Sequence, residues 1–232
     1  MMVEIPLIKQ LTQDLLDEAC PVYAEGASAY MKHKFRYLGV SSPKRRLISK
    51  NIIKQFPVES IKQVLKLVLQ LWKMPEREYQ YFAIDLLAAY RKQWNMDVLS
   101  VIEHCITHKS WWDTVDAISS DWTGPYFRRF PELIPVTEEW NVSSNIWMVR
   151  SSLLFQKKYK TATDVQLLSR YILHAAGTKE FFINKAIGWA LREYSYTNEA
   201  FVEEFVNQYP QLHPLSKREA LKAIERKYRA LA

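Results

Sequence analysis

The chain has 232 residues, and its 32 Lys and Arg outnumber 25 Asp and Glu, which leaves a formal net charge of +7 and a pI of about 9.2. With 48% apolar residues it can bury enough surface to offset the entropy lost on folding, which excludes a disordered chain. Only 5 residues are glycine, and neither G-x-G-x-x-G nor G-x-x-x-x-G-K-[ST] occurs, which excludes Rossmann and P-loop enzymes at the level of motifs. The positive charge indicates an anionic partner.

The cysteines and the N-terminal segment predict where the protein resides. Cys20 and Cys105 are too few for a disulfide framework, which is typical of a reducing compartment. The first twenty residues lack the basic and unbroken apolar regions of a signal peptide, and no run approaches the roughly 18 apolar residues of a membrane span. We therefore expect a cytoplasmic protein with no membrane partner and one domain over residues 1–232.

Helical periodicity runs through most of the chain. In the segment 60–72, apolar side chains recur at the spacing that places them on one face of a helix. The same pattern follows in the segments 76–92, 97–107, 145–159, 164–174, 180–194, 199–208 and 216–229. Prolines fall between these blocks, and the alternation typical of strands is not sustained. The sequence predicts an all-α protein.

Related helix openings recur along the chain. They lie at Arg77, Trp112, Trp147, Phe182 and Arg218, which are about 35 residues apart. This step is typical of helical-hairpin repeats, each of which must stack on its neighbours to bury its apolar face. We expect an α-solenoid of about six HEAT-like two-helix repeats, curved, with a basic concave face.

Four polar residues occupy similar positions in successive repeats: Asp116, Arg150, Lys185 and Lys222. Their side chains are therefore expected to project in one direction, on the surface that a solenoid offers to a partner. The row is expected to be basic and interrupted once by a carboxylate, at Asp116.

The segment 108–116 contains the densest group of candidate side chains. Trp112 and Asp116 are four residues apart and share a helical face, whereas Trp111 is expected to be buried with Val115 and Ile118. An aromatic ring beside a carboxylate can hold a cation. The alternative is that both tryptophans only pack against neighbouring helices while Asp113 complements the helix dipole.

A second group lies in the segment 184–194. Lys185, Trp189 and Arg192 share one helical face, which suits a phosphodiester backbone and its sugars. Gly188 lies inside the same predicted helix, where glycine often permits close approach of another backbone or a ligand. The alternative is a solvated basic face with a tryptophan packed at its edge.

Further basic clusters could extend such a surface, although each could equally be an ordinary solvated face. They lie at 32–36, 44–46, 128–129, 157–160 and 217–218. His104 and His108 flank Cys105, but H-E-x-x-H is missing and there is no second ligand cluster, so no metal site is expected. No cofactor is expected either, and no serine or cysteine nucleophile has a local base.

Several segments resemble the AlkD-type DNA alkylation repair glycosylases. The resemblance rests on K-S-W-W-D-T-V-D (109–116), N-I-W-M-V-R (145–150), F-F-I-N-K-A-I-G-W-A-L-R-E-Y (181–194), P-L-S-K-R-E-A (214–220), A-Y-M-K-H-K-F-R-Y-L-G-V (29–40) and W-K-M-P-E-R-E (72–78). It covers roughly residues 25–229, in order and at compatible spacing. It implies HEAT-like repeats and hydrolysis of the N-glycosidic bond of cationic N-alkylated purines, chiefly 7-methylguanine and 3-methyladenine, without enclosing the base.

The resemblance also implies roles for individual residues. It assigns the catalytic carboxylate to Asp116, its aromatic partners to Trp112 and Trp189, a conserved arginine to Arg150, and an aromatic near the lesion strand to Tyr30. Met148-Val149 departs mildly from the family pattern. Together with the basic residues, this predicts DNA contacts by Tyr30, Arg150, Lys185, Arg192, Lys217 and Arg218.

The sequence therefore predicts a monomeric, cytoplasmic and nucleoid-associated glycosylase that acts on double-stranded DNA and leaves an abasic site. A catalytically silent HEAT-repeat DNA-binding protein is the alternative, and a protein–protein adaptor is a third possibility. The basic residues of the row count against the adaptor. The intact set of Trp112, Asp116 and Trp189 favours the enzyme.

Overall fold

The computed structural model describes residues 4–231, which form helices and turns. Within this range there is no strand, and an isolated bridge joins Arg36 and Glu76. The all-α prediction is confirmed, and the helices follow one another as in an α-solenoid. None of the described helices is long and apolar enough to cross a membrane. The chain divides into two compact units, Met1–Val101 and Ile102–Ala232.

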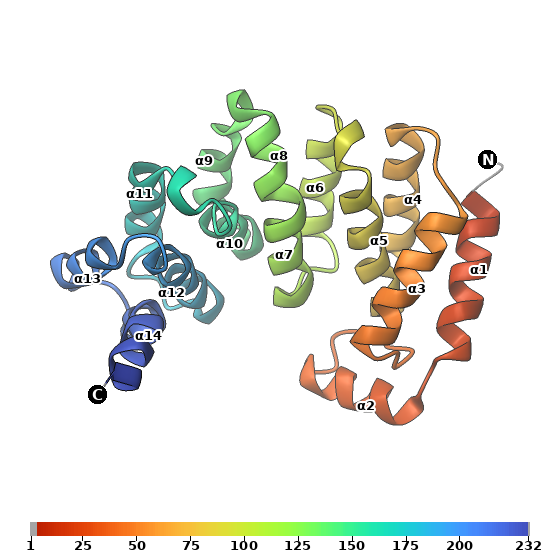
Figure 1. Ribbon diagram of the computed structural model, residues 1–232, viewed down its shortest axis with the longest axis horizontal. Helices are drawn as coiled ribbons and strands as arrows, with labels where there is room; N and C mark the ends of the chain where they lie inside the picture. The colour runs from red at the N-terminus through yellow and green to blue at the C-terminus, as the bar shows by residue number, and fades with distance from the viewer. Residues whose placement is uncertain (1–3, 232) are drawn as a thin grey trace. The chain divides into compact units, whose positions relative to one another are not determined.

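The helices of the first unit pack side by side in the order α1, α3, α5 and α4 (Figure 1). Leu71, Trp72 and Phe82 are among its fully buried side chains. The predicted helix 60–72 is confirmed as α4, whose N-cap Ser60 accepts a hydrogen bond from the Gln63 amide. The elements are α1 (Glu4–Asp17), α2 (Pro21–Tyr30), α3 (Ser42–Gln55), α4 (Ile61–Lys73), α5 (Arg77–Ala89), the 3₁₀ turn η1 (Arg91–Gln93) and the start of α6 (Val98–Thr107).

Helix α2 has no buried residue of its own and depends on the segment that follows it. In this segment Gly39 has a φ of +84°, and a Cβ there would lie 2.1 Å from the carbonyl oxygen of Cys20. The carboxylate of Glu78, which is 1% exposed, accepts hydrogen bonds from the amides of Leu38 (3.1 Å), Gly39 (2.9 Å) and Val40 (3.4 Å). A buried side chain of α5 therefore holds the loop that carries α2.

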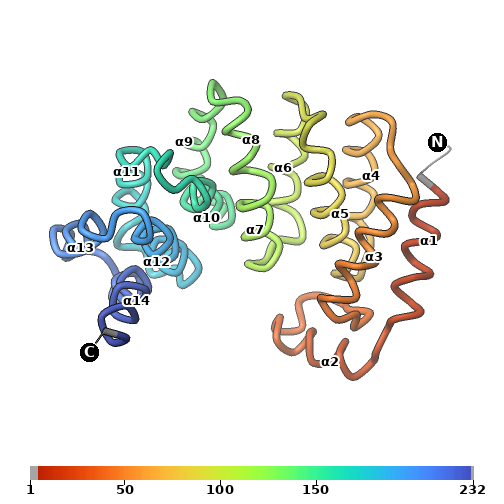
Figure 2. The backbone as a smooth tube through the Cα atoms, in the orientation of Figure 1, coloured from red at the N-terminus to blue at the C-terminus, as the bar shows by residue number. Residues whose placement is uncertain are grey.

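The second unit contains a row of helices in which α7 packs on α10, α10 on α12 and α12 on α14 (Figure 2). Helices α9, α11 and α13 pack beside this row and mostly alternate with it along the chain. The remaining elements are α7 (Trp112–Ile118), the π-helical turn η2 (Ser119–Thr123), α8 (Gly124–Arg129), η3 (Pro131–Leu133), α9 (Val136–Asn141), α10 (Ile146–Leu154), η4 (Lys160–Ala162), α11 (Val165–Ala175), α12 (Phe181–Ser195), α13 (Glu199–Gln208) and α14 (Pro214–Leu231).

The core of the second unit is aromatic. The Phe127 ring lies 5.6 Å from that of Trp140 and 5.5 Å from that of Phe155, with both pairs edge to face. The predicted helix 145–159 ends early, at Leu154, because the chain turns and Tyr159 enters the core to donate its hydroxyl to the carbonyl oxygen of Gly124 at 2.7 Å. Burial raises the pKa of Tyr159 to about 12.

The substitution Glu78→Ala tests how the first unit holds α2. It removes the acceptor of three amide hydrogen bonds, two of which involve Leu38 and Gly39, and should lower the free energy of unfolding by at least about 2 kcal/mol. The amides of residues 38–40 should exchange faster with solvent. Glu59→Ala, at an exposed position, is the control and should change the unfolding free energy by less than about 0.5 kcal/mol. Equal effects of the two substitutions in chemical denaturation would contradict this account.

Candidate functional site

Helix α7 begins after a short segment in which the backbone is not helical. Lys109 adopts a φ of +51°, and Trp111 is extended, with φ −157°, at the N-cap. Asp113 lies in the first turn, where a carboxylate complements the helix dipole. Trp112 and Asp116 both lie on α7, one turn apart and half-buried, as the four-residue spacing predicts.

Asp116 forms a bidentate ion pair with Arg150 of α10. The Nε and Nη2 atoms of Arg150 donate to the two carboxylate oxygens at 2.7 and 2.8 Å. The third nitrogen, Nη1, donates to the carbonyl oxygen of Phe182 on α12. The Arg150 side chain is 1% exposed, whereas that of Asp116 is 18% exposed. The arginine is therefore an internal support, and the carboxylate is the member of the pair that solvent reaches.

The indole ring of Trp189 on α12 lies among four cationic side chains. The guanidinium carbon of Arg150 is 5.1 Å from the ring centroid, and that of Arg192 is 5.9 Å away. The ammonium groups of Lys157 and Lys185 lie at 5.6 and 5.2 Å. These distances are within the range of cation–π attraction. Arg150 thus contacts both the carboxylate and the tryptophan that the resemblance assigned to catalysis.

A second carboxylate, Glu219 of α14, contacts Trp189 directly. It accepts hydrogen bonds from Lys185 Nζ (2.9 Å), Trp189 Nε1 (3.2 Å) and Arg192 Nη1 (2.9 Å). Burial raises its pKa, but the bonds from Lys185 and Trp189 and the charges of Lys185 and Lys222 outweigh this, so its pKa lies below the ordinary 4.5. Its contribution to stability is therefore complete above pH 4.5 and is lost as the pH falls through the lowered pKa.

Glu219 corrects the expected row of polar residues. The sequence predicts a row with a single carboxylate, at Asp116, but a second carboxylate, Glu219, faces Lys185. Lys222 is exposed on the same helix as Glu219, and its charge helps to lower the pKa of Glu219. The sequence contained a signal for this contact. Glu219 follows Lys185 by 34 residues, the same step that separates Arg150 from Asp116.

The expected burial of Trp111 with Val115 and Ile118 is also corrected. Trp111 is half-buried, and its ring lies 5.6 Å from that of Trp147 and 5.0 Å from that of Phe182. Its backbone is extended rather than helical, so the side-chain direction that helical spacing implies does not apply to it. The three rings form a cluster at the N-terminal ends of α7, α10 and α12.

The other predicted DNA contacts lie on both units. Tyr30 ends α2 in the first unit with 69% of its surface exposed, and it borders a hollow of about 330 Å³ together with Tyr23 and Tyr81. On α14, Lys217 is half-buried and Arg218 is exposed. DNA contacts of these residues, and of Lys185 and Arg192, stay predictions. The sequence predicts a DNA contact for Arg150 as well, but in this structure its side chain is buried and supports Asp116 instead. Among the described residues, no group of three or more His, Cys, Asp or Glu could hold a metal ion.

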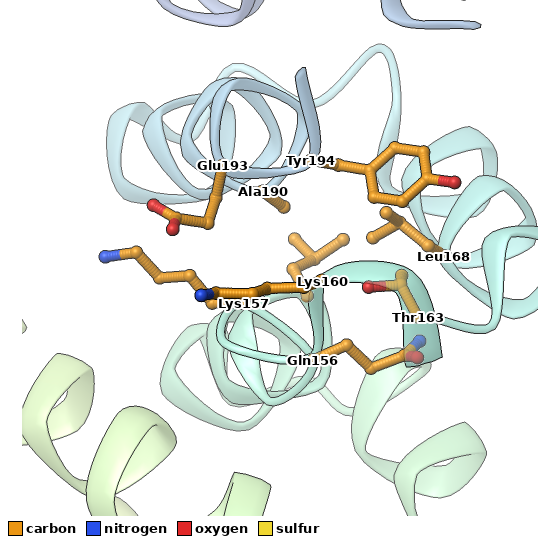
Figure 3. Close-up of a pocket in the computed structure, with 9 residues that line it drawn as sticks. Gln156, Lys157, Lys160, Thr163, Leu168, Ala190, Glu193 and Tyr194 are labelled. Carbon is orange, nitrogen blue, oxygen red and sulfur yellow. The ribbon is translucent and has the colours of Figure 1, made fainter. Parts of the chain in front are cut away.

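A hollow in the second unit lies beside Lys157, between the end of α10 and helices α11 and α12 (Figure 3). The carboxylate of Glu193 and the ammonium groups of Lys157 and Lys160 lie on the same side of it, and Tyr194 lies opposite. Its volume is about 10 Å³, which is room for about one water molecule. It cannot take a purine base.

Residues 11–224 match the family model of the DNA alkylation repair enzymes. The chain belongs to this family. A solved structure described as "Predicted DNA alkylation repair enzyme from Enterococcus faecalis" shares 33% sequence identity with this DNA alkylation repair family member, over 88% of this chain and 96% of the other, with a TM-score of 0.82. No curated protein matches. The family resemblance inferred from the sequence is confirmed.

The close packing of α12 on α14 can be tested at Gly188. A Cβ at this position would lie 2.5 Å from Cβ of Glu219 and 2.8 Å from the carbonyl oxygen of Ser216. Gly188→Ala should therefore lower the free energy of unfolding by about 2 kcal/mol, although alanine favours helix. The matched control is Gly26→Ala in α2, where nothing lies within 4 Å of the added Cβ. This control should raise the free energy by about 0.5 kcal/mol, and a Gly188→Ala protein as stable as wild type would refute the close packing.

Proposed function

We propose that this protein is a monofunctional DNA glycosylase that hydrolyses the N-glycosidic bond of cationic N-alkylated purines, such as 7-methylguanine and 3-methyladenine, and leaves an abasic site. The observation that carries the proposal is the solvent-accessible carboxylate of Asp116, which a buried arginine orients and which lies in the same cluster as Trp189. Membership of the DNA alkylation repair family supports it.

The chemistry requires little beyond a well-placed negative charge. An N-alkylated purine already carries a positive charge, so it leaves as a neutral base without a general acid. The sugar then develops oxocarbenium character, as in other glycosyl transfers. Asp116 can stabilise this cation and orient or deprotonate the attacking water. Because Arg150 fixes both carboxylate oxygens, little reorganisation is needed as charge develops.

The aromatic and basic side chains complete the proposed site. Trp112 and Trp189 would flank the deoxyribose and exclude bulk water. Lys185, Arg192, Lys217 and Arg218 would contact phosphates of double-stranded DNA, and Tyr30 would approach the lesion strand. The net charge of +7 suits this partner. We further propose that the protein acts as a monomer in the cytoplasm, associated with the nucleoid.

The first prediction for function concerns Asp116. Duplex DNA with a single 7-methylguanine should lose that base under single-turnover conditions, and Asp116→Asn should slow the release by about 100-fold or more, because the charge that stabilises the sugar cation is lost. Binding of undamaged duplex should be retained.

The matched control is Asp121→Asn, because Asp121 lies on the adjoining π-helical turn in an exposed pair with Lys158. Its rate should stay within about twofold of wild type. If the wild-type protein binds the duplex but releases no base, the chain is the silent DNA-binding protein and the glycosylase proposal is wrong.

The second prediction concerns the salt dependence of DNA binding. Each phosphate contact contributes about 0.9 to the slope of log K against log salt. Lys217→Ala and Arg218→Ala should therefore each reduce the slope by about 0.9, as measured by fluorescence anisotropy with an undamaged duplex. Lys217→Arg retains the charge and should leave the slope unchanged. Unaltered slopes in both alanine variants would remove α14 from the DNA interface.

A further inference from the structure

Glu219 connects α14 to three functional candidates on α12. Its side chain is 8% exposed, and its two oxygens accept bonds from Lys185, Trp189 and Arg192. These three residues lie at i, i+4 and i+7, so one carboxylate spans two turns of the helix. No other residue of the described cluster accepts a hydrogen bond from the indole of Trp189 in this structure.

The backbone around Glu219 holds its carboxylate at a fixed distance from α12. Because Gly188 has no Cβ, the Cα of Ser216 can lie 3.3 Å from where that atom would be. Ser216 Oγ donates to the carbonyl oxygen of Asn184 at 2.9 Å. The carboxylate is therefore attached to a helix that cannot slide along its neighbour without losing these contacts. This makes Glu219 suited to fixing an orientation rather than to solvating a charge.

The indole of Trp189 contacts one carboxylate directly and the arginine partner of the other. The Arg150 guanidinium, which pairs with Asp116, is 5.1 Å from the ring, and Glu219 accepts the indole N–H at 3.2 Å. The N–H bond selects one orientation of the ring about its side-chain torsions. Glu219 thereby controls how the Trp189 face is presented next to Asp116.

Glu219 also limits the positive charge of this surface. It neutralises one of the two charges of Lys185 and Arg192, whose side chains are 21% and 29% exposed and could otherwise attract phosphate freely. Because this carboxylate lowers the affinity for an anionic partner, we look for a separate role for it in the site. The geometry points to the orientation of Trp189.

We propose that Glu219 is a positioning residue for base release: it sets the plane of Trp189 and restrains Lys185 and Arg192, and so lowers the affinity for undamaged DNA in favour of a defined site geometry. The inference rests on the proposed glycosylase function. It predicts that loss of the carboxylate charge raises the affinity for undamaged DNA but lowers the rate of base release. A purely structural residue would not change these two quantities in opposite directions.

The test uses two variants of the full chain. Glu219→Gln removes the charge at nearly constant shape; it should bind undamaged duplex about threefold more tightly at low salt, with a steeper salt dependence, and release 7-methylguanine about tenfold more slowly at saturating protein. Glu219→Asp retains the charge but is one methylene shorter. It should bind undamaged duplex like wild type and still release base more slowly, because the bond to the indole N–H is lost.

Glu138→Gln is the matched control, because Glu138 forms an exposed pair with Arg170 and should change neither quantity. The proposal is overturned if both Glu219 variants release base within twofold of the wild-type rate. It is also overturned if affinity, rate and melting temperature all fall together in both variants, which is the signature of a structural role.

An NMR measurement separates this inference from the proposed function. The indole ¹H–¹⁵N resonance of Trp189, assigned by its absence in Trp189→Phe, should shift in both Glu219 variants of the DNA-free protein and stay in place in Glu138→Gln. If wild type releases no base, the glycosylase proposal fails. The resonance and the duplex affinity still report whether Glu219 bonds to Trp189 and pairs with Lys185. An unchanged resonance in both Glu219 variants refutes the proposed positioning of Trp189 by Glu219.

Discussion

The bidentate pair between Asp116 and Arg150 constrains three helices at once. Arg150 extends from α10, its Nε and Nη2 atoms reach the carboxylate on α7, and its Nη1 atom reaches the carbonyl oxygen of Phe182 on α12. A rotation of α10 by one residue would break all three bonds and leave a guanidinium buried without partners. Removal of one member of a fully buried pair costs about 3–5 kcal/mol, and this pair should cost less because Asp116 is 18% exposed. The stacking of these helices and the orientation of Asp116 therefore depend on the same contact.

The proposed reaction needs positive charge to bind the phosphate backbone and negative charge to stabilise a cationic sugar, and both lie around Trp189. The ring has four cationic neighbours, which can attract a phosphate backbone. Two carboxylates hold three of these cations in place: Asp116 pairs with Arg150, and Glu219 pairs with Lys185 and Arg192. Only Asp116 combines a fixed orientation with appreciable access to solvent, since its side chain is 18% exposed and that of Glu219 is 8% exposed. A cationic sugar or purine would therefore meet Asp116, whereas Glu219 is confined to its hydrogen bonds with α12.

The hollow beside Lys157 is too small to be a base-binding pocket. With a volume of about 10 Å³, it has no room for a base extruded from the duplex. The proposed chemistry does not need a base-binding pocket, because a cationic purine leaves without protonation by the protein. What the proposal requires is a preoriented carboxylate near an aromatic ring; α7 supplies Asp116, α10 the arginine that orients it, and α12 the ring of Trp189.

Much of the site could be predicted from the sequence because helical geometry is local. The spacing of Trp112 and Asp116, and that of Lys185, Trp189 and Arg192, determines that each group shares a helical face, and the step of about 35 residues determines that the helices repeat. Gly188 likewise predicted a close approach, but not by which element. Only the tertiary structure decided the remaining contacts. It buries Arg150 and pairs it with Asp116, it places Glu219 where it accepts the indole N–H of Trp189, and it packs Trp111 against Phe182. Each involves side chains on different helices, 30 or more residues apart, whose meeting depends on how helices stack rather than on the spacing along any one of them.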